Sequence, residues 1–353
     1  MPDPAGTDQA RGRVVFVGAV HEARPALAAL LTAPVDLVAV VTLTPSAAAR
    51  AAGFVDLAGM AKPRGIPVME TADLNAPEDV ARVRAMRPDL VIVVGWNRLL
   101  GDELLAVPTR GAVGFHASLL PRHRGRAPVN WVIIRGENIT GNTMMYLAPG
   151  ADTGDIIDQR RLAIDLHDTC ATVYEKVGES GAEMILKHLP ALLRGTAPRL
   201  RQKHEDADLL PKRTPAMGIT DWHRTPRQVH DWVRALTHPY PGAFTFLGGH
   251  RLHVWASALP GGDEPAWEPD PGTLMGLEGD AVRVRVASGS VLLIRVQQEH
   301  EAEEPAAAWF VRKGHRRGLV FAKVEPEIAC WALGEGPRPV HVPWLDTDRG
   351  GEK

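Results

Sequence analysis

The chain has 353 residues and a mass of 38.2 kDa, which exceeds the usual size of a single domain and predicts two. A hydrophobic content of 45% is typical of a globular protein with a real core, and a formal net charge of -2 argues against a chain-wide field for nucleic acid or membrane. Two cysteines exclude a disulfide scaffold and a paired-cysteine metal site, and no apolar run reaches the roughly 20 residues of a membrane span. We therefore expect a cytoplasmic protein that contacts no membrane and holds no metal.

The N-terminal part of the chain alternates short apolar runs with helical stretches. The apolar runs of strand length are residues 13–19, 36–43, 66–69, 89–95, 111–116 and 140–147. Residues 25–31 and 77–86 between them have helical patterns. Because strands that alternate with helices of this length form parallel, right-handed units, we predict a Rossmann-like α/β domain over 13–198. Its sheet is expected to be mostly parallel, with helices on both faces, and a helix capped by Asp168 and Thr169 should close the domain.

Beyond this domain the composition and the periodicity change. Residues 199–220 are charged and contain prolines, which predicts a surface linker. The pair Thr225-Pro226 indicates the start of a helix. Apolar residues then recur with period two, and turns at 248–249 and 288–290 predict hairpins. We therefore predict a smaller β-rich domain, an OB-like barrel, over 221–305.

Three features of the second half have no single interpretation from the sequence. The extension 306–353 shows no pattern that can be assigned, and residues 1–12 and the tip beyond 346 are expected to be disordered. Four aromatic residues could either fill the core of the barrel or form a stacking surface for a sugar or base. These are Trp222, Trp232, Tyr240 and Trp255.

Common signatures of other enzyme classes are missing. The run VFVGAVHEARP follows a strand but contains one glycine, Gly18, where a dinucleotide-binding turn needs three. The sequence has no HExxH motif for zinc and no Gly-x-Ser-x-Gly motif for a serine hydrolase. These absences argue against a nicotinamide cofactor, a zinc site and a nucleophilic serine.

The segment 89–159 carries the residues that suggest chemistry. Ligands bind open parallel sheets beyond the carboxyl ends of the strands, and several predicted strands end in this segment. His116 ends one of them, and Asp152 lies in the loop APGADTGD after a neighbouring strand, where a carboxylate could approach and orient an imidazole. Each residue alone fits a structural role. Their joint placement favours acid–base chemistry.

Two runs in this segment, GFHASLLPRHRGRAPVNWVIIRGE and TGNTMMYLAPGADTGDII, resemble the core of the formyltetrahydrofolate-dependent formyltransferases. That family includes enzymes that act on methionyl-tRNA, on glycinamide ribonucleotide and on amino-sugar nucleotides. The resemblance covers roughly residues 13–300, and the part after residue 210 is most similar to the amino-sugar branch and to the folate-hydrolysing domain of formyltetrahydrofolate dehydrogenase. It implies transfer of a formyl group from the co-substrate 10-formyltetrahydrofolate to a primary amine, without a metal.

The resemblance also implies roles for individual residues. In the family an Asn, a His and an Asp carry the chemistry; His116 and Asp152 match two of them, but Gly114 stands at the Asn position. Loss of one oxyanion donor costs about 10²–10³ in rate if nothing replaces it. The candidate replacements are a protonated His116, a backbone N–H near Gly114, Asn97 or Asn130. Hydrolysis of the formyl donor and a non-catalytic, folate-binding regulator stay open as alternatives.

Binding residues follow from the same resemblance. Those expected to hold the folate are Trp96, Asn97, Arg98, Leu99, Leu100, Ala148, Gly150 and Ala151. Those expected to contact the substrate are Ser118, Arg122, Arg124 and Arg126. The arginines either hold phosphates of a nucleotide-linked substrate or form a solvated turn.

The charge of the second domain bears on the amine acceptor. Between residues 260 and 310 the acidic residues include Asp263, Glu264, Glu268, Asp270, Glu299, Glu301, Glu303 and Glu304. Because phosphate contacts dominate nucleic-acid affinity, an acidic domain suits tRNA poorly. We expect a small-molecule or nucleotide-linked amine rather than a nucleic acid, with methionyl-tRNA as the alternative and a homodimer left open.

Overall fold

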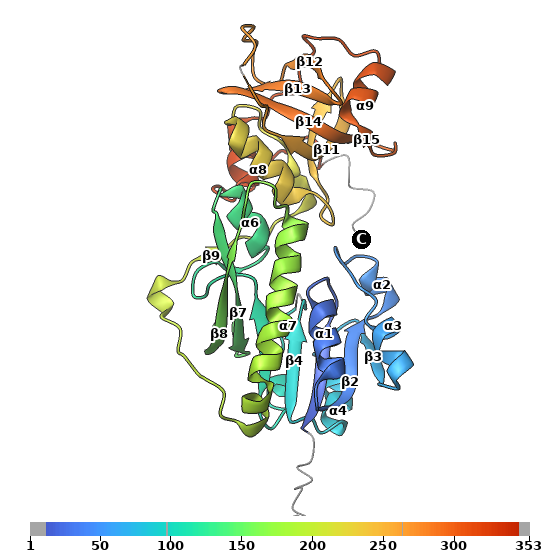
Figure 1. The fold of residues 1–353 in the computed structure, drawn as a ribbon, viewed down its shortest axis with the longest axis vertical. Coiled ribbons are helices and arrows are strands. Elements are labelled where there is room, and N and C mark those ends of the chain that lie inside the picture. The colour runs from blue at the N-terminus through green and yellow to red at the C-terminus, as the bar shows by residue number, and fades with distance from the viewer. Residues whose placement is uncertain (1–11, 97, 263, 346–353) are drawn as a thin grey trace, which may run out of the picture. The chain divides into compact units, whose positions relative to one another are not determined.

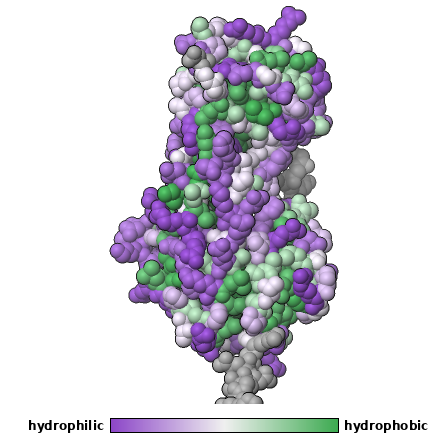
Figure 2. All heavy atoms as spheres, viewed as in Figure 1, coloured by the Kyte–Doolittle hydropathy of each residue, from purple (hydrophilic) through white to green (hydrophobic). Residues whose placement is uncertain are grey.

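The computed structural model describes residues 12–96, 98–262 and 264–345, and the chain divides into two compact units (Figure 1). The first unit contains the chain up to residue 125 together with 140–163 and 174–209; the remaining segments form the second. Apart from Gly12, the ends expected to be disordered lie outside the described residues. Within the described part, no helix is both long and apolar enough to cross a membrane. Figure 2 shows hydrophilic residues spread over most of one face, with hydrophobic residues between them.

The first unit is built on a seven-stranded sheet with the strand order β3-β2-β1-β4-β5-β7-β8. Strands β1 to β5 pair in parallel, and β7 pairs antiparallel to β5. The prediction of a mostly parallel, Rossmann-like sheet is therefore confirmed. The strands are β1 (Arg13–Gly18), β2 (Asp36–Leu43), β3 (Val68–Thr71), β4 (Leu90–Val94), β5 (Ala112–His116), β7 (Ile139–Tyr146) and β8 (Ile156–Ala163).

Helices cover both faces of this sheet because alternate strand residues point to opposite sides. Val14 and Phe16 of β1 pack with residues of α1 and α7, whereas Val15 and Val17 pack with residues of α4 and α5. Thr169 caps α7, since its Oγ1 accepts the N–H of Thr172 at 3.3 Å. The helices named here and the short ones between them are α1 (Ala23–Thr32), α2 (Pro45–Ala48), α3 (Ala58–Ala61), α4 (Pro77–Ala85), α5 (Asp102–Leu105) and α7 (Cys170–Arg194).

The second unit contains an antiparallel sheet with the order β10-β11-β14-β13-β12, and β15 pairs with β14. The predicted β-rich second domain is confirmed, although the described residues show no ladder between β10 and β12 that would close the path into a barrel. Its elements are α6 (Pro128–Ile134), α8 (Pro226–Leu236), β10 (Ala243–Leu247), β11 (His250–Ala258), β12 (Leu274–Glu278), β13 (Ala281–Val286), β14 (Gly289–Gln298), β15 (Glu304–Pro305), α9 (Ala306–Arg312) and α10 (Pro326–Ala332).

Local signals in the second unit behave as the sequence suggests, with one difference in the position of a turn. Thr225 forms a capping box at the start of α8, as the Thr-Pro pair predicts. The first hairpin turns at 248–249, but the second turns at 287–288, because Val286 pairs with Gly289. The tryptophans belong to the core rather than to a binding surface: Trp222, Trp232 and Trp255 are buried, and Trp222 stacks on Phe321 at 5.0 Å between ring centroids. Tyr240 is half-buried.

The predicted linker is more than a connection. Part of it, Leu209–Leu210, forms β9, which pairs with β6 (Arg124–Gly125) in a separate two-stranded sheet. The segment also contains two 3-10 turns, His204–Asp206 and Pro215–Gly218. Its side chain Gln202 is 7% exposed. The segment therefore contributes to the packing of the first unit.

Candidate active site

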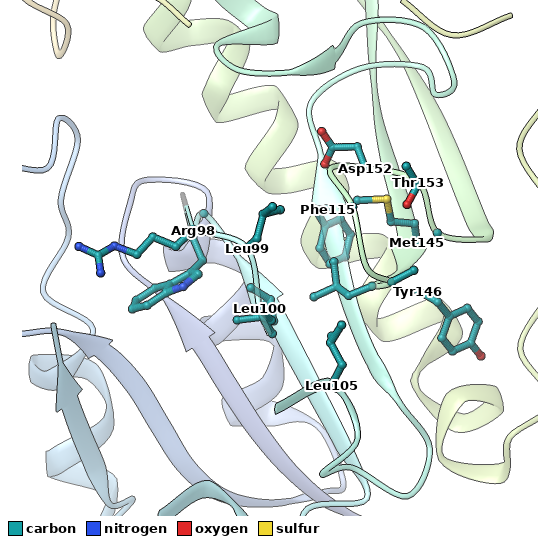
Figure 3. A pocket seen from close by; sticks show the side chains of 17 residues that line it. Arg98, Leu99, Leu100, Leu105, Phe115, Met145, Tyr146, Asp152 and Thr153 are labelled. Carbon is teal, nitrogen blue, oxygen red and sulfur yellow. The ribbon is translucent and has the colours of Figure 1, made fainter. Parts of the chain in front are cut away.

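A pocket lies in the first unit at the carboxyl ends of β4 and β5, beside the loop that follows β7. The pocket is open to solvent, and its empty space is about 580 Å³ with part of that solvent included. Figure 3 shows Leu99 and Leu100 on one side of it and Asp152 with Thr153 on the other, whereas the side chain of Arg98 extends away. The pocket is thus apolar on one side and presents a carboxylate on the other.

His116 and Asp152 come together at this pocket, as the sequence predicts, although β7 is antiparallel to β5 and it is the loop after β7 that brings Asp152 to His116. Nδ1 of His116 lies 3.5 Å from Oδ2 of Asp152, and both side chains are largely buried. The same Oδ2 accepts the backbone N–H of Gly125 at 2.9 Å. Asp152 belongs to the pocket lining, while His116 stands behind it and is not among the lining residues that the structure describes. The carboxylate of Asp152 therefore faces the pocket, and the imidazole of His116 contacts the carboxylate without lining the pocket.

The second ring nitrogen of His116 fixes its tautomer. Nε2 lies 2.6 Å from the backbone carbonyl oxygen of His123. Because a carbonyl oxygen only accepts hydrogen bonds, Nε2 carries a hydrogen and donates it. In the neutral ring Nδ1 is then the free proton acceptor, and it faces Asp152. Since Nε2 is bound to the carbonyl oxygen of His123, a protonated His116 could offer only Nδ1 to a formyl oxygen, and Nδ1 faces Asp152.

The loop that carries Asp152 has an unusual backbone. Asp152 is left-handed, with φ of 56°, a conformation that costs a residue other than glycine about 1 kcal/mol or more. Gly154 lies so close to the end of β7 that a Cβ atom at this position would be 1.7 Å from the carbonyl oxygen of Tyr146. Only glycine fits that position, and the close approach holds the loop over the end of the sheet.

Gly114 faces a filled space. A Cβ atom at Gly114 would lie 2.6 Å from Cδ2 of Leu147, and both residues line the pocket. Leu147 therefore occupies the place that a side chain at position 114 would enter. Of the amides proposed as replacements, Asn130 donates to the carbonyl oxygen of Ala235 at 2.6 Å within the second unit, and Asn97 lies outside the described residues.

Polar side chains in the loop after His116 form hydrogen bonds with the protein itself. Ser118 is fully buried and donates its hydroxyl hydrogen to the carbonyl oxygen of Arg122 at 2.8 Å, so this structure shows it binding its own loop. Arg124 is 8% exposed and donates to the side chain of Gln202, so it does not stand ready for a phosphate. Arg122 and Arg126 are exposed, as either interpretation of these arginines requires.

Residues that sequence reasoning missed support the site from behind. Gln202 donates from Nε2 to the carbonyl oxygens of Asp152 and Gly154, at 2.9 and 2.7 Å. Asp208 accepts the backbone N–H of His123 at 2.6 Å. Gln202 and Asp208 stand about fifty to ninety positions from these partners along the chain, so no local pattern identifies them.

A further acid, Glu22, lies near one of the residues that line the pocket. Burial raises the pKa of Glu22 to about 7, because desolvation disfavours its charged form. Its Oε2 lies 3.5 Å from the position of a Cβ atom at Gly95, and Gly95 lines the pocket. Among the described residues, no group of three or more His, Cys, Asp or Glu side chains is arranged to hold a metal ion.

Comparison with known proteins identifies the family of the chain. Residues 13–189 match the family model described as formyl transferase, and residues 212–314 match its C-terminal domain. A methionyl-tRNA formyltransferase from Geobacter sulfurreducens is 34% identical over 297 residues, which cover 84% of this chain and 92% of the relative. This chain belongs to the formyl transferase family.

Solved structures resemble the fold of this formyltransferase at lower identity. HypX from Aquifex aeolicus, in complex with tetrahydrofolic acid, has a TM-score of 0.62 at 20% identity; the match covers 89% of this chain and 50% of HypX. An N-formyltransferase from Helicobacter canadensis, in complex with folinic acid and dTDP-3-aminofucose, has a TM-score of 0.61 at 16% identity. That match covers 80% of the formyltransferase and 98% of the Helicobacter protein.

The predicted folate residues divide between the pocket and other places. Those that line the pocket are Trp96, Arg98, Leu99, Leu100, Ala148 and Gly150. Ala151 is not among the lining residues that the structure describes, although its neighbours are. The side chain of Leu99 is 62% exposed and lines the pocket, so it is open to contact with a ligand there.

Proposed function

We propose that this formyltransferase moves a formyl group from 10-formyltetrahydrofolate to a primary amine, with Asp152 and His116 handling the proton. The observation that carries the proposal is the buried imidazole–carboxylate pair whose carboxylate faces the pocket. HypX is solved with tetrahydrofolic acid and the Helicobacter protein with folinic acid, and both ligands support a folate donor.

The chemistry requires one proton to move between two nitrogens. The amine nitrogen attacks the formyl carbon, negative charge collects on the formyl oxygen, and the bond from that carbon to N10 then breaks. The amine loses a proton as it attacks, and N10 gains one as it leaves. Asp152 lines the pocket and can accept the first proton and deliver the second. His116, with Nδ1 directed to the carboxylate, holds a proton between the two steps.

A nucleotide-linked amino sugar is one class of acceptor. The Helicobacter enzyme is solved with dTDP-3-aminofucose, and its match covers almost its whole length. The exposed Arg122 and Arg126 follow the catalytic histidine in sequence, and guanidinium groups suit the phosphates of such a substrate.

Methionyl-tRNA is a second candidate, and one observation favours it. In the sequence, the acidic residues between 260 and 310 argue against tRNA. In the structure most of them pair with arginines of the second unit, so the number of acidic residues alone overstates the negative charge of that unit. Glu301 and Glu304 pair with Arg312, Glu303 with Arg295, Glu264 with Arg283 and Glu268 with Arg285. Asp263 lies outside the described residues. The Geobacter relative is named for this acceptor.

The test is release of tetrahydrofolate from 10-formyltetrahydrofolate, followed by absorbance with and without acceptors. The acceptors are a dTDP-3-amino sugar, methionyl-tRNA and a panel of small amines. We expect release only when an amine is present, with formylated product in equal amount. Release without an amine would show a hydrolase, and binding without release would show a regulator; either result contradicts the proposal.

Restoring an Asn at position 114 is expected to impair this enzyme. In Gly114→Asn the new side chain displaces Leu147, and the space open to that half-buried leucine is the pocket itself. We expect kcat/KM to fall by about tenfold through a higher KM for the formyl donor. Adding Leu147→Ala should restore most of the loss, because it clears the contact. Steady-state kinetics of both variants measure this, and a rate increase in Gly114→Asn alone would show that the missing amide is a handicap instead.

A further inference from the structure

The side chain of Gln202 forms a complete set of hydrogen bonds beneath the active-site loop. Its Nε2 donates both hydrogens, one to the carbonyl oxygen of Asp152 and one to that of Gly154. Its Oε1 accepts from Nε and Nη2 of Arg124. Gln202 is 7% exposed and Arg124 is 8% exposed, so water cannot readily replace these partners. The amide therefore joins two loops that the chain separates by about thirty positions.

Gln202 binds the main chain of a residue that is under backbone strain. Asp152 is left-handed, and such a conformation persists only where the surroundings hold it. Two contacts do so from opposite ends of the residue. The N–H of Gly125 binds the carboxylate at 2.9 Å, and Gln202 binds the main-chain carbonyl at 2.9 Å. The two anchors are themselves linked, because Gly125 follows Arg124 in β6.

We propose that Gln202, oriented by Arg124, is a positioning residue that fixes the left-handed backbone of Asp152 and thereby aims its carboxylate into the pocket. This inference rests on the proposed function, in which Asp152 transfers the proton. Without the amide, the peptide that follows Asp152 is free to rotate toward an ordinary conformation. That rotation turns the side chain away from both His116 and the pocket, so the step that suffers is the chemistry rather than binding of the formyl donor.

Two variants test the role. Gln202→Ala removes all four hydrogen bonds, and Gln202→Glu keeps the acceptor for Arg124 but removes both donors to the Asp152 loop. We expect kcat of each variant to fall by about tenfold to hundredfold, with KM for 10-formyltetrahydrofolate within about threefold of that of the unchanged chain. Gln202→Glu should stay folded because a carboxylate pairs well with a guanidinium, so its result stands even if Gln202→Ala does not fold.

The matched control is Asn142→Ala. Asn142 is another buried amide of the first unit, 1% exposed, and its Nδ2 donates to the carbonyl oxygen of Val177 and to the hydroxyl of Ser180, away from the pocket. The melting temperature of this variant should fall, as in the Gln202 variants, but its kcat should stay the same as that of the unchanged chain. A kcat of Gln202→Glu within about threefold of that of the unchanged chain would overturn the proposal.

A crystal structure of Gln202→Glu separates this inference from the proposed function. We expect the φ angle of Asp152 to leave the left-handed region in the variant. If the unchanged chain transfers no formyl group, the proposed function fails, and the φ angle alone then decides the role of Gln202. An Asp152 backbone that stays left-handed in that case would overturn the positioning role.

Discussion

Replacing Asp152 with Asn is expected to reduce kcat for formyl transfer by about 10²–10⁴, the range typical of a lost general acid–base group. The amide keeps the shape of the carboxylate and an oxygen for the N–H of Gly125, so the loop should stay in place. It cannot take a proton from the attacking amine at neutral pH. Binding of the formyl donor should therefore persist, measured by equilibrium titration beside single-turnover kinetics.

The control for this variant is Asp155→Asn. Asp155 lies in the same loop, but its carboxylate pairs with Arg199 at 3.6 Å and is not among the lining residues that the structure describes. This variant should transfer formyl groups at close to the rate of the unchanged chain. If Asp152→Asn were as active as Asp155→Asn, Asp152 would have no part in proton transfer.

The second large effect is expected from His116→Ala, which should lower kcat by about 10²-fold or more. The substitution removes the imidazole that contacts Asp152 and also the hydrogen bond to the carbonyl oxygen of His123. Without the imidazole, no group holds the proton between its loss from the amine and its transfer to N10. KM for the donor should change little, because His116 stands behind the residues that line the pocket. Steady-state kinetics over a range of donor concentrations separate the two parameters.

A second buried histidine–aspartate pair provides the control. Nε2 of His188 lies 2.8 Å from Oδ2 of Asp158; both side chains are largely buried, and neither belongs to the pocket lining that the structure describes. Burial would raise the pKa of Asp158, but hydrogen bonds from Lys187 and His188 outweigh it and hold the pKa at about 2. His188→Ala should therefore cost stability in urea unfolding without lowering kcat. Equal kcat losses in the two histidine variants would mean that His116 acts only through folding.

The parallel strands of the first unit could be predicted because a strand buried on both faces is a continuous apolar run, as in β1 and β4. Strand β8 escaped prediction because it ends the order of the sheet, and its sequence IIDQRRLA carries charges on partly exposed positions. Edge strands of this kind have no clear period, so only their pairing reveals them.

The candidate site could be predicted in part for a similar reason. His116 ends β5, and Asp152 lies in the loop after its neighbour β7, so the sequence placed both near the sheet. Strand ends alone do not bring them together, because β7 is antiparallel to β5 and its last residue, Tyr146, pairs with Val113; the loop after β7 carries Asp152 to His116. Gln202 could not be found that way, since its segment has the composition of a linker and its contacts depend on the fold. The internal hydrogen bonds of Ser118 and Arg124 could not be predicted either, because a polar residue in an active-site loop can bind the protein itself as readily as a ligand. Their substrate contacts stay predictions.

The most direct test of the account is a double-mutant cycle on kcat with Asp152→Asn, His116→Ala and the variant that carries both changes. If the two side chains pass one proton between them, removing the second adds almost nothing once the first is gone, and the double variant should be about as slow as Asp152→Asn alone. If the two losses multiply instead, the side chains act independently, and the shared proton at the centre of the account is contradicted.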